Sequence, residues 1–264
     1  MLNLLWNEAA LLRAEQAAGA ALLALAVALV ARRSGIHLGK ETVFALARGL
    51  GQIVVVGLLL IFILGGARWI SAIVLLAMMM AGAAIAARRT RHIPGIFQVT
   101  TSSILIGAGV VISVMVASGV IGTTPATLIP VGSMLIANAM NTTALALDRF
   151  SSEVESHTGH IEAALALGAA PAVVVAPYVQ AAVRASLIPN LNNLRSLGIV
   201  WIPGLMAGMV IAGSNPVEAA LYQFVVVAML YATAGSTALL CTRFVRSHVF
   251  SPAEQLTRGV SPRP

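Results

Sequence analysis

Apolar residues along the chain form seven long runs that are separated by short polar segments. The runs are Ala17–Ala31, Val43–Leu64, Trp69–Ala87, Ser102–Ile121, Ala126–Leu147, Ile199–Ala212 and Val217–Val245. Most of them approach the roughly 20 residues that an α-helix needs to cross a hydrocarbon layer. The pattern predicts an all-α, polytopic membrane bundle of about seven transmembrane helices, which forms a single transmembrane domain over residues 1–264.

Composition agrees with this pattern. Hydrophobic residues make up 59% of the 264 residues and charged residues only 9%, whereas a soluble domain carries roughly 25% charged residues. So little charge excludes a soluble enzyme, a nucleic-acid-binding protein and a disordered chain. The single cysteine, Cys241, excludes an internal disulfide and a cysteine-cluster metal site. We expect a multi-pass protein of the inner or plasma membrane, with lipid and no nucleic acid around it.

Charge in the connections predicts the orientation. Fourteen of the 16 basic residues lie on alternating connections or in the adjoining ends of the runs: Arg32, Arg33, Lys40 and Arg48; Arg88, Arg89 and Arg91; Arg149, Arg184 and Arg195; and Arg243, Arg246, Arg258 and Arg263. Because Lys and Arg favour the cytoplasmic side, the N-terminus is predicted outside and the C-terminus inside. The long polar segment 148–197 is then cytoplasmic. Glu8 and Glu15 precede the first run, so it is expected to be a retained helix rather than a signal peptide.

The seven runs hold almost no ionisable residue away from their ends. One Asp or Lys at a helix centre costs about 2.5–3.5 kcal/mol, so such residues persist only with a purpose, as in proton relays. Their absence disfavours a proton-driven transporter. A channel can work with polar groups and backbone carbonyls. A nucleotide-independent secondary transporter or channel therefore remains an alternative, and so does a membrane scaffold without cargo.

The segment Ile161–Pro171 has the pattern of a short helix followed by a stop. Its Ala and Leu residues favour helix, Gly168 can end the helix with a positive φ, and Pro171 can open the next one. A small apolar protrusion on a cytoplasmic connection suits docking in the groove of a partner. The alternative is an interfacial helix that lies on the lipid.

This segment is similar to the EAA loop of ABC transporter permeases, the cytoplasmic coupling helix that fits the ATPase subunit. The matching residues are Glu162, Ala163, Ala164, Leu167, Gly168 and Pro171. The resemblance implies that they contact an ABC ATP-binding subunit and that 148–197 is a coupling segment.

A longer stretch resembles the FetB (YbbM) family of ABC permeases. It comprises Leu187–Pro189, Gly198–Met209 and Ala212–Gln223, with Ile129-Pro130 and Asn138–Met140 upstream. The resemblance implies a seven-span, non-catalytic permease that forms a homodimer and uses ATP and Mg²⁺ bound by a separate ATPase subunit. It also implies export of iron or another metal, with plant relatives linked to aluminium tolerance. No cofactor or metal site on this chain is expected.

The fifth run carries Asn138, Asn141 and Thr142 at spacings of three and four, so they share one helix face, with Met140 between them. Polar groups in a membrane helix point at other helices or at water rather than at lipid. We predict that these four residues line the translocation path. Hydrogen bonding between helices is the alternative.

Two further features carry weaker predictions. Gly204 and Gly208 form a small-xxx-small pattern, which lets helices approach closely, and we expect it to pack spans or to form a dimer interface. Pro203 before them could act as a hinge. Plain helix packing is the alternative for all three. His157 and His160 could share a helical face beside Glu153 and Glu155 and bind a metal, although a solvated loop has the same composition.

Overall fold

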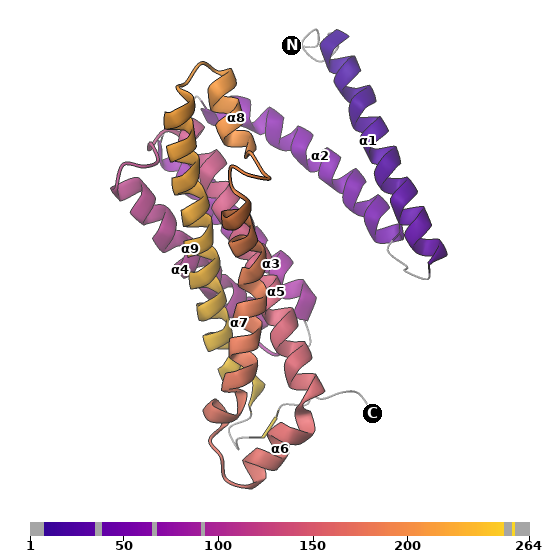
Figure 1. Ribbon diagram of the computed structural model, residues 1–264, viewed down its shortest axis with the longest axis vertical. Coiled ribbons are helices and arrows are strands. Elements are labelled where there is room, and N and C mark those ends of the chain that lie inside the picture. Colours follow the sequence, from indigo (N-terminus) through magenta and orange to yellow (C-terminus); the bar gives the residue numbers. More distant parts are fainter. Residues whose placement is uncertain (1–7, 35–38, 65–67, 91–92, 251–254, 257–264) are drawn as a thin grey trace. The chain divides into compact units, whose positions relative to one another are not determined.

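The computed structural model describes residues 8–34, 39–64, 68–90, 93–250 and 255–256 (Figure 1). These residues form α-helices and contain no β-strand, only the isolated bridges Leu197–Trp201 and Phe250–Leu256. Six described helices are long and apolar enough to cross a membrane, and Thr42–Leu58 is a shorter apolar helix. The all-α class and the prediction of about seven membrane helices are confirmed.

The chain divides into two compact units, residues 1–65 and 66–264. The first unit pairs α1 (Glu8–Arg33) with α2 (Gly39–Leu64) in a helical hairpin (Figure 1). Large apolar side chains of both helices, such as Leu22 and Ile53, are exposed. This hairpin therefore buries little apolar surface by itself, as expected for helices that lie in lipid or against other protein.

The second unit contains the remaining described helices. They are α3 (Arg68–Ala87), the short 3₁₀ turn η2 (Arg88–Thr90), α4 (Ile96–Ala117), α5 (Pro125–Ser156), α6 (Thr158–Ala166), α7 (Pro171–Ser196), α8 (Gly204–Ile211) and α9 (Pro216–Val249). The long helices α5, α7 and α9 lie side by side, with α6 at one end of the bundle and α8 at the other (Figure 1). α3 packs against α4 and α5, and α4 also contacts α9.

Proline and glycine set the ends of these helices. Pro125, Pro171 and Pro216 occupy the first turn of α5, α7 and α9, where a missing N–H costs nothing. Gly119 and Gly213 follow α4 and α8 with φ of 73° and 95°, a conformation that favours glycine. Proline and glycine in the sequence therefore explain where α5, α7 and α9 begin and where α4 and α8 end.

Two clusters of buried apolar residues hold the unit together. One lies among α3, α4, α5 and α9 and includes Leu75, Ile104, Met115, Leu135 and Val226. The other lies toward α6 and includes Phe150, Val154, Ile161, Ala182, Cys241 and Val245. The second cluster anchors α6 and the end of α9 to α5 and α7, so this end of the bundle is a packed structure rather than a loose loop.

The prediction of a helical span over Ile199–Ala212 is wrong. That run contains a non-helical segment, residues 197–203, followed by α8, whose eight residues rise only about 12 Å. The helix of sufficient length is α7, within the segment predicted to be cytoplasmic. Pro177 and Pro189 lie inside α7 without ending it, and in a bundle neighbouring groups can satisfy the backbone that such prolines free. The sixth crossing thus starts in α7 and continues, after a break, in α8.

Candidate functional site

The connection from α6 to α7 forms a well-defined turn at one end of the bundle. Gly168 has a φ of 85°. Its N–H donates to Leu165 O at 2.9 Å, and the N–H of Ala169 donates to Ala164 O at 3.0 Å. This pair of bonds is the Schellman pattern, which ends a helix and turns the chain sharply. The predicted helix, stop and restart at Pro171 are confirmed.

The turn presents an apolar side chain to the surroundings. Leu167 is 89% exposed, and Glu162, Ala163 and Gly168 are exposed beside it, while Ala164 and Pro171 are half-buried. Ile161, six residues before Leu167, is fully buried and fixes α6 to the bundle. The six residues predicted to contact an ATPase therefore form one compact protrusion whose tip is Leu167.

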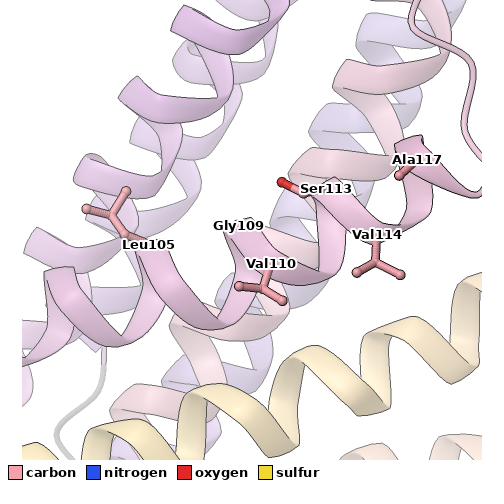
Figure 2. A pocket seen from close by; sticks show the side chains of 6 residues that line it. All are labelled: Leu105, Gly109, Val110, Ser113, Val114 and Ala117. Atoms are coloured by element: carbon pink, nitrogen blue, oxygen red, sulfur yellow. The ribbon is translucent and has the colours of Figure 1, made fainter.

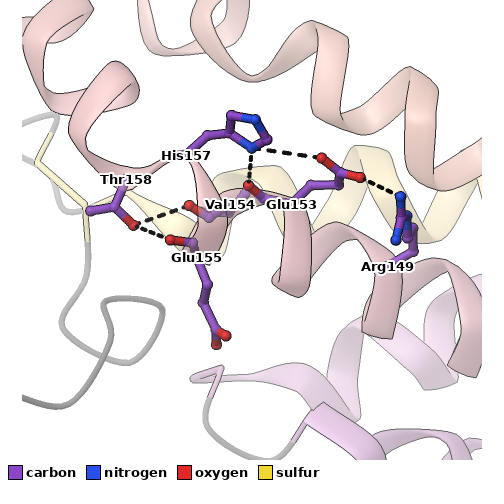
Figure 3. A network of polar contacts seen from close by, with 6 residues as sticks. All are labelled: Arg149, Glu153, Val154, Glu155, His157 and Thr158. Atoms are coloured by element: carbon purple, nitrogen blue, oxygen red, sulfur yellow. Dashed lines mark hydrogen bonds and ion pairs between the residues drawn. The ribbon is translucent and has the colours of Figure 1, made fainter.

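A polar network fixes the corner between α5 and α6 (Figure 3). Arg149 forms an ion pair with Glu153 at 2.7 Å, and His157 Nδ1 lies 3.6 Å from the other Glu153 oxygen. The His157 ring also stacks on Tyr178 of α7, with ring centroids 5.0 Å apart. These contacts connect the corner between α5 and α6 to α7.

The rings of His157 and His160 are edge to face, with 6.3 Å between their centroids. Nδ1 of His157 also lies 2.9 Å from the carbonyl oxygen of Glu153. Among the described residues, no three His, Cys, Asp or Glu side chains are grouped to hold a metal ion. The network therefore supports a structural role for His157.

The four residues predicted to line a path point in different directions. Asn138 donates a hydrogen bond to Leu230 O of α9 at 2.7 Å. Thr142 is buried, and its hydroxyl oxygen accepts from Asn190 Nδ2 of α7 at 3.4 Å. Met140 is half-buried near Gly82 of α3. Asn141 alone is exposed. Two of the four thus make the hydrogen bonds between helices that were the alternative, and the path role stays a prediction.

Pro203 is buried at the start of α8, directly after the break. Gly204 and Gly208 are exposed, and a Cβ atom built on either would meet nothing within 4 Å. Within the described part of the chain, this small-residue face of α8 packs against nothing, so a dimer interface there remains a prediction.

The depth of each group in the membrane follows from α5 and α9, which run in the same direction (Figure 1). Their stretches without charge are Pro125–Leu147 and Ala219–Thr242. At 1.5 Å per residue each is about 35 Å long, close to the hydrocarbon thickness of about 30 Å. We call the layer that these two uncharged stretches span the apolar zone. The hydrogen-bonded pair Asn138 and Leu230 lies near the midpoint of both stretches and therefore marks the middle of this zone.

α7 runs opposite to α5, and the Asn190–Thr142 hydrogen bond sets its level. Arg195 follows Asn190 by five residues and is therefore level with about Ala137 of α5, in the middle of the zone. Arg184 precedes Asn190 by six residues and is level with Asp148, at the charged edge near α6. Arg195 is therefore an ionisable residue inside a candidate span that the seven predicted runs did not include.

The break between α7 and α8 also lies within the apolar zone. The N–H of Met206 in α8 donates to Gln223 Oε1 of α9 at 3.2 Å. Gln223 is seven residues from Leu230, or about 10 Å from the middle. Residues 197–203 thus lie between the middle and this level, in the half away from α6. The sequence contained a signal for the polar end of α7, since Asn192 and Arg195 follow an apolar stretch at helical spacing. The prolines within that stretch argued against one continuous helix.

The outer side of α4 carries an open hollow of about 570 Å³ (Figure 2). Leu105, Gly109, Val110, Ser113, Val114 and Ala117 line it. Gly109, Ser113 and Ala117 recur every four residues, the small-residue spacing that lets another helix approach closely. With one hydroxyl and no charge, this groove suits helix packing rather than polar cargo.

Residues 14–250 match the uncharacterised protein family UPF0014. The chain belongs to the UPF0014 family. It is 33% identical over 258 residues to the UPF0014 membrane protein STAR2 of Oryza sativa subsp. japonica, covering 97% of this chain and 90% of the relative. Its identity to the probable iron export permease protein FetB of Escherichia coli is 31% over 230 residues, 86% of this chain and 88% of the relative.

A third relative, the protein ALUMINUM SENSITIVE 3 of Arabidopsis thaliana, is 30% identical over 245 residues, 92% of this chain and 89% of the relative. No solved structure matches the chain. Together with the helices that can cross a membrane, these relatives show that this UPF0014 member is a multi-pass membrane permease. The resemblance to the FetB family is confirmed.

Proposed function

We propose that this chain is the membrane-spanning subunit of an ATP-binding cassette transporter that exports iron or another metal. In this proposal two copies form the translocation path, and a separate subunit binds and hydrolyses ATP with Mg²⁺. The observation that carries the proposal is the α6–α7 turn, where a firmly anchored helix exposes Leu167 at the end of the bundle. The FetB relative, a probable iron export permease protein, supports metal as the cargo.

The distribution of arginine residues supports the α6 end of the bundle as the cytoplasmic face. Arg88, Arg149, Arg243 and Arg246 lie there, near the connection between α5 and α7. A surplus of arginine favours the cytoplasm, where an ATPase subunit is found. With α7 as a membrane helix, the coupling segment contracts from 148–197 to the corner around α6.

The test is co-purification of the permease with the ABC ATPases of the cell, followed by ATP hydrolysis with and without vanadate. A stoichiometric ATPase and vanadate-sensitive turnover are expected. The variant Leu167→Asp should lose ATPase binding, because it places a charge at the tip of the docking surface. Ile211→Asp is the matched control, since Ile211 is 87% exposed at the opposite end and should leave binding unchanged.

Retained ATPase binding by Leu167→Asp would contradict the coupling role. One observation favours the alternative of a nucleotide-independent transporter or channel, namely Arg195 in the middle of the apolar zone. Transport by the purified permease alone in liposomes, driven by an ion gradient without nucleotide, would establish that alternative and overturn the ATP-driven proposal.

A further inference from the structure

Polar side chains follow one exposed face of α7 from the α6 end to the middle of the apolar zone. Gln180, Arg184, Asn192 and Arg195 are all exposed, and their spacings of four, eight and three place them on the same side of the helix. Ile188 lies on this face between them. A face of this kind is costly against lipid and is normally directed at water or at other protein.

The side chain of Arg195 is too short to place its guanidinium group outside the apolar zone. It lies in the middle of the zone, about 15 Å from either edge, and an arginine side chain spans less than half of that distance. In the described part of the chain, Arg195 forms no ion pair. Among the helices from α3 to α9, the acidic residues lie at the charged ends, as in Asp148 and Glu218.

The backbone directly after Arg195 also requires polar surroundings. Ser196 O accepts the N–H groups of Ile199, Val200 and Trp201 at 3.0–3.2 Å. By contrast, the carbonyls of Gly198, Ile199, Val200 and Ile202 accept no hydrogen bond from the described residues, and Val200 is 85% exposed. Non-helical backbone at this depth is tolerated only inside protein or along a water-filled cavity.

We infer that Arg195 and Asn192, with the break at 197–203, form a cargo-binding site for an anionic group in the middle of the membrane. Gln180 and Arg184 lie on the same face nearer to the α6 end, outside this site. A second copy placed against this face would bring another Arg195 rather than a carboxylate, so two-fold symmetry strengthens the demand for an anion. This inference rests on the proposed transport function and assigns its cargo class: a carboxylate or phosphate anion, either free or as the ligand of an exported metal.

Trp201 offers a direct readout, because it lies six residues from Arg195 and is 38% exposed. With Trp6→Phe and Trp69→Phe it becomes the only tryptophan of the chain. The purified full-length permease in lipid nanodiscs is titrated with citrate, with gallium citrate and with zinc chloride at constant ionic strength, and Trp201 fluorescence is recorded. The titration contains no ATPase and no ATP. Its result therefore does not depend on whether the permease couples to an ATPase.

A saturable response to citrate or gallium citrate is expected, and none to zinc chloride. The tighter of the two citrate forms identifies the free anion or the metal complex as the cargo. Arg195→Gln should weaken binding at least about tenfold, because it removes a charged hydrogen-bonding partner. Arg195→Lys should retain most binding, and Arg184→Gln, on the same face at the charged edge, is the matched control.

Equal citrate affinity in Arg195→Gln and the parent protein would overturn the inference, as would equal losses in Arg195→Gln and Arg184→Gln or a response to zinc chloride alone. If Arg195→Gln does not give a monodisperse helical protein, Asn192→Leu replaces it. That variant keeps the charge and should still weaken citrate binding several-fold; unchanged binding would again overturn the site.

Discussion

Asn138 donates a hydrogen bond of 2.7 Å to the backbone carbonyl of Leu230, and this bond joins the midpoints of α5 and α9. The side chain is half-buried and belongs to the packing of the bundle. One turn away, Asn141 is exposed. Two asparagines three residues apart thus have different roles, which sequence spacing alone did not separate.

Asn138→Leu should destabilise the permease. The variant removes one hydrogen bond between membrane helices, an interaction that averages about 0.6 kcal/mol and reaches about 1.7 kcal/mol. The free energy of unfolding, measured by titration with a denaturing detergent, should fall by about that amount. Asn141→Leu is the control and should change it by less than about 0.5 kcal/mol. Equal effects of the two variants would show that the Asn138 bond contributes nothing.

Local chemistry allowed much of the fold to be predicted. Apolar runs located α1, α2, α3, α4, α5 and α9, and glycine and proline located the α6–α7 turn at Gly168 and Pro171. The error at α7 has a physical cause. Pro171, Pro177 and Arg184 suggest an interrupted apolar stretch when each is considered alone, but α7 packs against α5 and α9 as one continuous helix.

The candidate site was less accessible to sequence reasoning. The residues proposed for coupling lie within ten positions of one another, so a sequence motif could suggest them. The site at Arg195 depends instead on depth, which only the pairs Asn190–Thr142 and Asn138–Leu230 reveal. The sequence of α7 alone does not predict which residues of α5 lie beside it. The relative level of the two helices determines whether an arginine is at the surface or in the middle of the membrane.

Gly168 should tolerate asparagine better than valine. Its φ of 85° is costly for residues with a Cβ, by about 1–2 kcal/mol, and asparagine tolerates it best. Gly168→Val should therefore lower the hydrogen-exchange protection of α6 more than Gly168→Asn. Gly159→Ala, in α6 itself with open space around the added Cβ, should raise that protection, because alanine favours helix over glycine. Equal protection in the valine and asparagine variants would contradict the role of the positive φ.

Gly107 should not accept even a methyl group without loss. A Cβ atom there would lie 2.5 Å from Thr237 Cγ2 and 3.1 Å from Thr237 Cα, because α4 and α9 approach closely at this point. Gly107→Ala should lower the free energy of unfolding by about 1–3 kcal/mol. Gly109→Ala, two residues along the same helix with nothing within 4 Å of the new Cβ, should leave it almost unchanged. A stable Gly107→Ala protein with unaltered unfolding would show that the two helices separate easily.

Cysteine labelling tests the path of the chain through α7, the break and α8. In a Cys241→Ala background, which removes the only native cysteine, Gly159→Cys places a thiol on α6 and Ala212→Cys places one at the end of α8. Both positions are exposed. A membrane-impermeant maleimide added to intact cells should label Ala212→Cys, and should label Gly159→Cys only after permeabilisation.

The physical reason is the summed length of this crossing. α7 begins beside α6, Arg195 reaches the middle of the apolar zone, and α8 continues toward the opposite edge. Labelling of both thiols from the same side would show that residues 171–212 do not cross the membrane. The break would then lie in water, where its free carbonyls and Arg195 cost nothing, and the argument for an anion site would lose its basis. Labelling from opposite sides instead fixes the break within the membrane, where these groups require polar surroundings.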